Sequence, residues 1–337
     1  MTTRTNASSS AASLSQQVLA ALRPAKTFSM RNRNALVTGG ARGLGLEIAR
    51  VLVQRGAHVA IVARDPDEVA RGVADLEARI RDGQRVVGEV CDLRDGSAID
   101  TMLATVQARL GPLDVLVNNA GIIQVGPLDA MRFEDFEEAL RIHCFAPLRT
   151  MLGVRASMRA RGGGRIANIS SIGGLISVPH LLPYSASKFA LNGLSQGMHA
   201  ELGRENILVS TIAPGLMRTG SPRQALFKGN REAEYTWFAI SDSLPLLTIP
   251  SDRAARRIVL ALERGEPQVV LGVPFKIAAF ANAVAPGLVT RALTLVSALL
   301  PAGSDPVARK GYDSESKVVP SVLTTLTERA ATQNNER

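Results

Sequence analysis

A tyrosine and a lysine stand four residues apart in the stretch 184–188, which reads Tyr-Ser-Ala-Ser-Lys. Residues with this spacing lie one above the other on a helix, so the ammonium of Lys188 would lie beside the phenol of Tyr184. A neighbouring cation favours the phenolate and would bring a group that normally titrates near pH ~10 toward neutrality. A phenol of this kind can give or take a proton in a reaction. The spacing also occurs in ordinary surface helices, so the interpretation depends on the residues around it.

A glycine-rich turn stands near the start of the chain, where residues 38–45 read Thr-Gly-Gly-Ala-Arg-Gly-Leu-Gly. Gly39, Gly43 and Gly45 would let the backbone pass close to a pyrophosphate, whose charge meets the positive end of the following helix. A βα turn without a ligand is the alternative. The position of the turn between a strand and a helix favours a nucleotide site.

The elements that must hold these residues alternate between short apolar strands and amphipathic helices. The expected strands are 34–38, 58–63, 86–90, 113–117, 165–169, 207–212 and 268–272. Helices are expected at 66–81, 97–110, 133–151 and 252–264, besides those after the glycine turn and at Tyr184. This order predicts an α/β fold with one doubly wound parallel sheet, similar to a Rossmann domain. Residues 216–250 show no regular pattern.

The composition allows a substantial buried core, because 46% of the 337 residues are hydrophobic and 20% are charged. The net charge is +9, but the basic residues are dispersed apart from the acid-free opening segment. A dispersed charge indicates a solvated surface, so we do not expect nucleic-acid binding.

Cysteine and histidine usage bounds the compartment and the cofactors. Cys91 and Cys144 each fall in an apolar context, which predicts buried free thiols in a reducing, cytoplasmic compartment. The four histidines are scattered, and we expect no metal site.

With Ser171 upstream of Tyr184 and Lys188, and with the glycine turn, the chain resembles the short-chain dehydrogenase/reductases from about Asn34 to about Gly272. The resemblance implies an oxidoreductase that interconverts an alcohol and a carbonyl. Tyr184 would be the general acid/base, and Lys188 would lower its pKa and hold the nicotinamide ribose. Ser171 stands thirteen residues before the tyrosine, as in the family, and is preferred to Ser170 as the residue that hydrogen-bonds the substrate oxygen.

The resemblance also implies a set of cofactor contacts along the chain. Adenine contacts would come from Asp92 and Leu93, and the Asn119-Ala120-Gly121 stretch would line the adenosine ribose. The segment 214–219 matches the Pro-Gly-x-x-x-Thr pattern of the family. The full predicted cofactor set is Gly39, Arg42, Gly43, Leu44, Gly45, Arg64, Asp92, Leu93, Asn119, Ala120, Gly121, Tyr184, Lys188, Pro214, Gly215 and Thr219.

The end of the second strand favours NADP(H) over NAD(H). A carboxylate there would bond the ribose and repel a 2′-phosphate, whereas this chain has Ala63 and Arg64. Arg42 in the glycine turn is a second guanidinium, and a phosphate accepts bidentate hydrogen bonds from such groups. Asp65 stands one position too late to be the ribose acceptor by the family pattern.

One residue departs from the family. Many members have an asparagine in the helix that follows the Asn-Asn-Ala-Gly strand, and His143 stands at that place. Its spacing from Phe136 and Leu140 points it inward. It is either a buried histidine bonded to the backbone or a replacement that supports a water-mediated proton path.

The two ends lie outside the catalytic domain expected at 34–272. Residues 1–33 are expected to be a disordered tail with one short amphipathic helix over 14–22, and a transit peptide is an alternative. Residues 273–337 are expected to form an amphipathic helical extension and a polar tail. The apolar run at 274–301 is interrupted by Lys276 and Arg291, so it is too short to span a membrane. It would pack on the domain or in an oligomer, or lie on a membrane surface.

The substrate would lie beneath residues 216–250, where Tyr235, Trp237 and Phe238 suggest an apolar, lipid-like molecule unless they are simply core residues. The sequence therefore predicts an NADP(H)-dependent oxidoreductase of apolar alcohols and carbonyls. The alternatives are a nucleotide-binding scaffold without turnover and a membrane-surface protein that uses the extension.

Overall fold

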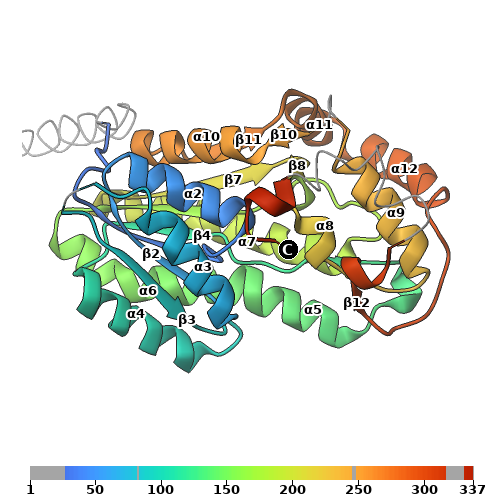
Figure 1. Cartoon of the computed structure of the whole chain (residues 1–337). Coiled ribbons are helices and arrows are strands. Elements are labelled where there is room, and N and C mark those ends of the chain that lie inside the picture. The colour runs from blue at the N-terminus through green and yellow to red at the C-terminus, as the bar shows by residue number, and fades with distance from the viewer. Residues whose placement is uncertain (1–26, 82, 245–247, 316–329, 337) are drawn as a thin grey trace, which may run out of the picture.

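The computed structural model describes residues 27–81, 83–244, 248–315 and 330–336 of the chain (Figure 1). Seven strands within these residues form one parallel sheet in the order β11-β7-β6-β4-β1-β2-β3. The strands are β1 (Asn34–Thr38), β2 (His58–Ala63), β3 (Val86–Val90), β4 (Val115–Asn118), β6 (Gly164–Ile169), β7 (Ile207–Pro214) and β11 (Gln268–Leu271). The predicted doubly wound parallel sheet is confirmed.

Helices cover both faces of this sheet, which explains why strands such as β2 are apolar almost throughout. One face is covered by α2 (Gly43–Gln54), α3 (Pro66–Glu77) and α10 (Ser251–Arg264). The other is covered by α4 (Gly96–Leu110), α6 (Ala146–Ala160) and α7 (Leu182–Leu202). Each face has its own hydrophobic cluster against the strands.

The single helix predicted over 133–151 is wrong in detail. The structure has α5 (Phe133–Leu140), a π-helical turn (Arg141–Phe145) and then α6. The amide of Ala146 bonds the carbonyl of Arg141, five residues back. The cause is Pro147, which lacks an N–H and whose ring would meet the carbonyl of His143 in a regular helix.

Residues 216–250, expected to be irregular, contain short regular elements. These are β8 (Met217–Arg218), α8 (Ser221–Gln224), β9 (Leu226–Phe227), α9 (Arg231–Ser241) and β10 (Ile249–Pro250). The start of α9 had a readable signal, because the Asn230 side chain caps the helix by accepting from the amide of Ala233. Together with residues 123–125 and the loop at 178–184, α9 forms a third hydrophobic cluster at the end of the sheet.

The extension consists of α11 (Val273–Val284) and α12 (Pro286–Ser297), neither of which has a buried residue. Phe275 packs against Gly215, and Asn282 Nδ2 donates to the Leu175 carbonyl at 2.9 Å. No helix of the described residues is both long enough and apolar enough to cross a bilayer.

The described part of the tail beyond residue 302 is more regular than its composition suggests. The short strand β12 (Arg309–Lys310) pairs with β9, which also pairs with β5 (Gln124–Val125). At the other end, the amide of Phe28 donates to the Glu263 carbonyl at 2.7 Å and Met30 is buried. Residues 27–33 are therefore packed on the domain, while the predicted helix at 14–22 lies outside the described residues. The domain boundaries stay predictions.

Candidate active site

Two adjoining cavities lie at the carboxyl ends of the central strands, where open parallel sheets bind ligands. The smaller, of about 90 Å³, lies beyond β2 and β3. The larger, of about 200 Å³, extends from the glycine turn to Tyr184 and Lys188. Gly39 and Gly121 line both, so the two form one groove across the sheet edge, which we call the dinucleotide groove.

The glycine turn has no room for side chains. Gly39 and Gly43 have φ angles of +60° and +55°, and a Cβ on Gly45 would lie 2.0 Å from the Gly39 carbonyl oxygen. Leu44 is buried, and Arg42, the N-cap residue of α2, makes no side-chain capping bond. The first turn of α2 contains no acidic residue. This helix start therefore fits an anion such as a pyrophosphate.

The stretch Asn119-Ala120-Gly121 is tied to the glycine turn. Asn119 Nδ2 donates to the carbonyls of Thr38 and Gly39, both at 3.1 Å. The Thr38 hydroxyl accepts in turn from the amides of Asn119 and Ala120 at 3.0 and 3.2 Å. These bonds fix the end of β4 beside the end of β1, and both line the groove.

Charge at the end of β2 is arranged as the sequence indicates. Arg64 is exposed and lines the smaller cavity. Asp65 is engaged elsewhere, because its carboxylate caps α3 by accepting from the amides of Asp67 and Glu68 at 2.9 Å. Arg42 also lines the groove, and its guanidinium donates to Glu68 at 2.9 Å. A phosphate at this edge would therefore meet Arg64 directly and compete with a carboxylate for Arg42.

The residues expected at adenine line the same end of the groove. Asp92 and Leu93 follow β3 and both border the smaller cavity. The carboxylate of Asp92 pairs with Arg94 at 2.5 Å, and this hydrogen bond lowers its pKa.

The catalytic candidates meet where β6 ends and α7 begins. Tyr184 and Lys188 lie one turn apart on α7, with Lys188 Nζ 5.6 Å from the centroid of the tyrosine ring. Lys188 Nζ donates to the Ile169 carbonyl at 2.8 Å. Ser171 lines a cavity with Tyr184, whereas the hydroxyl of Ser170 is turned to the Lys188 carbonyl at 3.3 Å. This placement supports Ser171 over Ser170.

The sequence predicted a lowered pKa for Tyr184, whereas its surroundings in the protein raise this pKa. Burial raises the pKa of Tyr184 to about 12, although a hydrogen bond with Ser171 opposes the rise. Burial also lowers the pKa of Lys188 to about 7. The lysine is therefore not the fixed cation assumed from the spacing, and the phenol is protonated at neutral pH.

His143 is buried, with a side chain that joins two parts of the site. Its Nε2 accepts from the amide of Ile122 at 3.1 Å, so the ring proton lies on Nδ1. Nδ1 then donates to the Ser187 hydroxyl at 2.7 Å, and Ser187 donates to the Tyr184 carbonyl at 2.8 Å. Burial and the charge of Lys188 lower the pKa of His143, which keeps the ring neutral. The buried, backbone-bonded alternative describes this histidine.

The residues after β7 complete the site. Pro214 is the last residue of β7, and Gly215 follows with Phe275 packed against it. A Cβ on Gly215 would lie 1.8 Å from the Phe275 ring, so only glycine fits. Thr219 is 2% exposed and its hydroxyl lies 2.6 Å from that of Ser221.

A cavity of about 320 Å³ lies on the other side of Tyr184, and we call it the substrate cavity. Its lining is mainly apolar, comes from five separate segments and includes Ser171 and Tyr184. The lining residues include Val178, Leu181, Leu216, Trp237, Phe238 and Phe275. One carboxyl, that of Asp242, also borders it, and burial raises the pKa of this group to about 8.

Three residues at the site were not found from the sequence. Phe275 comes from the extension, Asp242 from the end of α9, and Glu336 from the C-terminal end, where it borders the dinucleotide groove. None stands in a motif, and each reaches the site only through the packing of distant segments.

We expected both cysteines to be buried, and the structure differs from this expectation. Cys91 is buried and Cys144 is half-buried, and both are free thiols. Burial raises the pKa of Cys91 to about 11 and also raises that of Cys144, so neither is activated. Among the described residues, no group of three or more His, Cys, Asp or Glu side chains could hold a metal ion.

Comparison with known proteins places this site in a family. The family model of the short chain dehydrogenases matches residues 33–227. With the parallel sheet, the glycine turn and the Ser171/Tyr184/Lys188 arrangement, this match shows that the chain belongs to the short chain dehydrogenase family. It is an oxidoreductase of the class that acts on alcohols and carbonyls.

The matches to individual relatives cover most of each relative's length. Gluconate 5-dehydrogenase of Gluconobacter oxydans is 32% identical over 192 residues, 57% of this chain and 74% of the relative. 3alpha-hydroxysteroid dehydrogenase of Mediterraneibacter gnavus is 33% identical over 190 residues, 56% and 76% of the two chains. The crystal structure of a gluconate 5-dehydrogenase from Burkholderia cenocepacia J2315, in complex with NADP and tartrate, matches with a TM-score of 0.63 and 27% identity. That match covers 74% of this chain and 97% of the other.

Proposed function

We propose that the protein is an NADP(H)-dependent oxidoreductase that interconverts an apolar alcohol and its ketone or aldehyde. The observation that carries the proposal is the position of Tyr184. Its side chain lines both the dinucleotide groove and the substrate cavity, so a proton at its hydroxyl lies between the two. A general acid must stand at this junction if hydride and proton reach the same carbonyl group.

The choice of NADP(H) is supported by the charges at the end of β2. Arg64 is exposed there and, within the described part of the chain, forms no side-chain hydrogen bond. Asp65, the nearest carboxylate, is committed to capping α3. A related solved structure holds NADP. A 2′-phosphate would gain a guanidinium partner in this chain and meet no free carboxylate.

Different residues at the site would bind the cofactor, bind the substrate and transfer the proton. When bound, NADPH would supply the hydride to the carbonyl carbon. Ser171 would hydrogen-bond the carbonyl oxygen as negative charge develops on it. Tyr184, protonated at neutral pH because burial raises its pKa, would give its proton to that oxygen. Lys188, held by the Ile169 carbonyl, would position the nicotinamide ribose. A protonated phenol suits the reductive direction.

A substrate panel tests the proposal. We expect NADPH oxidation with apolar ketones and aldehydes, and lower kcat/KM with sugar acids and polyols, because the substrate cavity has an apolar lining. A preference for sugar acids would contradict the apolar substrate class. Tight NADPH binding without turnover across the panel would favour a nucleotide-binding scaffold instead.

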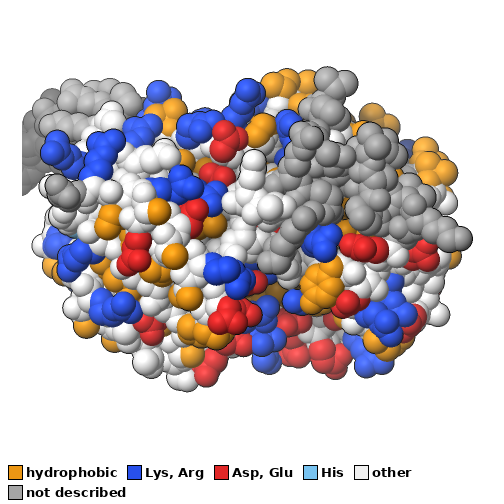
Figure 2. Space-filling view, in the orientation of Figure 1, with side chains coloured by type: hydrophobic (Ala, Val, Ile, Leu, Met, Phe, Trp, Pro, Cys, Tyr) orange, Lys and Arg blue, Asp and Glu red, His pale blue; other side chains and the backbone are white. Residues whose placement is uncertain are grey.

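Contact with a membrane surface is a second candidate function, supported by α11 and α12. Ile277, Phe280, Leu288 and Leu295 are 65–73% exposed. Between residues 267 and 304 the chain has no acidic residue, while Lys276 and Arg291 are present. Figure 2 shows hydrophobic side chains at the edge of the molecule where α11 and α12 lie, in contrast to the mixed charges elsewhere on this face. An apolar, basic surface of this kind suits anionic lipid.

Flotation with liposomes that contain phosphatidylglycerol tests this candidate. The full chain should float, and a Phe280→Glu/Leu288→Glu variant should not. Phe133→Glu is the matched control, because Phe133 is 74% exposed on α5. An intact chain that stays in the lower fractions would exclude membrane contact.

A further inference from the structure

The last described residues, 330–336, lie against the glycine turn rather than in solvent (Figure 1). The amide of Gly43, the first residue of α2, donates to the Asn334 carbonyl at 2.9 Å. Asn335 Nδ2 donates to the Ala41 carbonyl at 2.9 Å. Ala331 and Asn334 are 0% and 1% exposed. The segment is therefore docked on the turn by backbone contacts and by burial.

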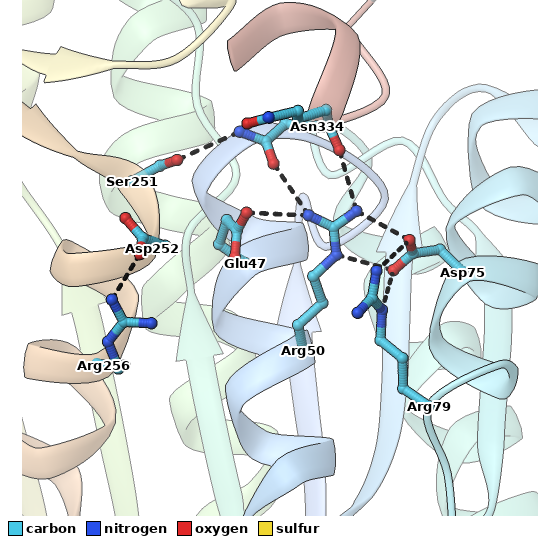
Figure 3. A network of polar contacts seen from close by, with 9 residues as sticks. Glu47, Arg50, Asp75, Arg79, Ser251, Asp252, Arg256 and Asn334 are labelled. Carbon is cyan, nitrogen blue, oxygen red and sulfur yellow. Dashed lines mark hydrogen bonds and ion pairs between the residues drawn. The ribbon is translucent and has the colours of Figure 1, made fainter. Parts of the chain in front are cut away.

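Arg50 holds the segment from the next turns of α2 (Figure 3). Its guanidinium donates to Asn334 Oδ1 and to the Gln333 carbonyl, both at 3.0 Å. The same guanidinium pairs with Asp75 on α3, which fixes its orientation. Asn334 Nδ2 reaches in the opposite direction and donates to the Ser251 hydroxyl of α10 at 3.2 Å. Asn334 thus joins α2 to α10 across the start of α2.

Glu336 extends this contact into the dinucleotide groove. Its Oε2 accepts from the amide of Gly220. Its Oε1 lies 3.0 Å from where a Cβ on Gly43 would stand, directly at the start of α2. The side chain is 4% exposed and borders the same cavity as Tyr184 and Lys188. An acidic group is thus held where the family places a pyrophosphate.

We propose that residues 330–336 are an internal competitor of the dinucleotide, which occupies the pyrophosphate part of the groove and must leave before the cofactor binds. The inference rests on the proposed function. The steric reason is that Asn334 and Glu336 take the amide of Gly43 and the space beside it. Glu336 adds electrostatic repulsion against a second anion when it is ionised, and burial raises its pKa to about 7.

The test is NADPH titration of the full chain by fluorescence. The docked segment reduces the fraction of molecules that can bind, so the apparent Kd is raised in proportion. An Asn334→Ala/Glu336→Ala variant should bind NADPH about tenfold more tightly than the parent chain if roughly nine in ten molecules hold the segment docked. Gln333→Ala is the matched control: its side chain is exposed and its contact with Arg50 is made by the backbone carbonyl, so the Kd for NADPH should not change.

Amide hydrogen exchange gives a second readout that does not depend on turnover. NADPH should speed exchange at residues 331–336 of the parent chain, since the segment is displaced. Equal Kd values in parent and double variant, or slower exchange at 331–336 with NADPH, would overturn the inference and leave the proposed function intact. Failure of the double variant to bind either dinucleotide would overturn both.

Discussion

The two sides of Tyr184 are built in different ways. On one side, the dinucleotide groove is made from the ends of β1, β2 and β4 and from backbone groups of glycines and turns. On the other, the substrate cavity is lined mainly by side chains of α9, of α11 and of three further segments, at 123, 171–184 and 215–221. The groove is continuous with the most regular part of the fold. The cavity is assembled from its least regular part.

This difference separates binding of the cofactor, which the family shares, from selection of the substrate, which differs between members. At the glycine turn the groove offers backbone donors, which stay the same whatever side chains surround them, so this part suits a common cofactor. A cavity lined by side chains changes shape with each substitution in its walls, so it suits individual substrates. Variants on the two sides should therefore affect different steps.

The largest effect is expected at the junction. Tyr184→Phe removes the proton donor, so kcat for a ketone should fall by about 10²–10⁴-fold. NADPH affinity should be unchanged, because the ring remains. Stopped-flow turnover and a fluorescence titration measure the two quantities. Tyr312→Phe, at a tyrosine that is 41% exposed, is the control. Retained turnover in Tyr184→Phe would place the proton donor elsewhere.

A change in the groove should affect cofactor choice alone. Arg64→Ala removes a guanidinium from the adenosine end, and a charge-assisted hydrogen bond contributes about 1.5–3 kcal/mol, so NADPH affinity should fall about 10–100-fold. NADH affinity should not fall. Arg81→Ala, which is exposed beyond the end of α3, serves as the control. Equal losses for NADPH and NADH would contradict a role in binding the 2′-phosphate.

The histidine that joins groove and helix should matter mainly for stability. His143→Leu leaves the amide of Ile122 and the hydroxyl of Ser187 without their partner, which should lower the free energy of unfolding by about 1–3 kcal/mol. His143→Asn keeps an acceptor for the amide and should lose less. Urea unfolding measures both. A Leu variant as stable as the parent would show that neither bond contributes.

A change in the cavity wall should affect substrate alone. Phe275→Ala removes a ring that borders the cavity, and loss of roughly 1–2 kcal/mol of apolar contact should raise KM for apolar substrates several-fold. NADPH affinity should stay the same. Phe280→Ala, on the same helix but 71% exposed, should change neither quantity. A loss of NADPH affinity in Phe275→Ala would break the separation of the two sides.

The last effect is a pH dependence of stability that comes from the acid in the cavity. Burial and the nearby Glu336 raise the pKa of Asp242 from 3.8 to about 8. Between these pH values the folded chain keeps a proton on Asp242 that the unfolded chain has released. The stability that this group contributes below about pH 4 is therefore lost as the pH rises to about 8. Asp242 interacts electrostatically with Glu336 and with Tyr184. Asp242→Asn should reduce this slope, by no more than about 1.4 kcal/mol per pH unit. Equal slopes in urea unfolding would contradict the shift.

The sequence was sufficient for the sheet and for the backbone part of the groove. The bounds expected for β1, β2 and β3 agree with the structure, because each is an apolar run bounded by turn or charged residues. The glycine turn could be read because a backbone that approaches a ligand has no residue but glycine to use. Ser171, Tyr184 and Lys188 meet because they stand on adjacent elements.

The remaining parts depend on packing that local patterns do not encode. Phe275 and Gly215 stand 60 residues apart, and Glu336 and Gly43 stand 293 apart. The π-helical turn depends on where one proline falls, and the pKa values of Tyr184 and Lys188 depend on how deeply both are buried. Spacing predicted which groups would meet, but not the environment that tunes them.

The π-helical turn at Arg141–Phe145 sets the rotational phase between two helices. One added residue turns everything after it by about 100° around the helix axis. With the turn in place, His143 faces Gly121 while Met151 and Val154 face the core. Deleting one residue here would make the helix regular but rotate one of these sets away from its partner. Chain length in this short stretch is therefore fixed by the contact of His143 with residues 121–122 and by the core at once, and homologous chains should tolerate substitutions there but not gaps.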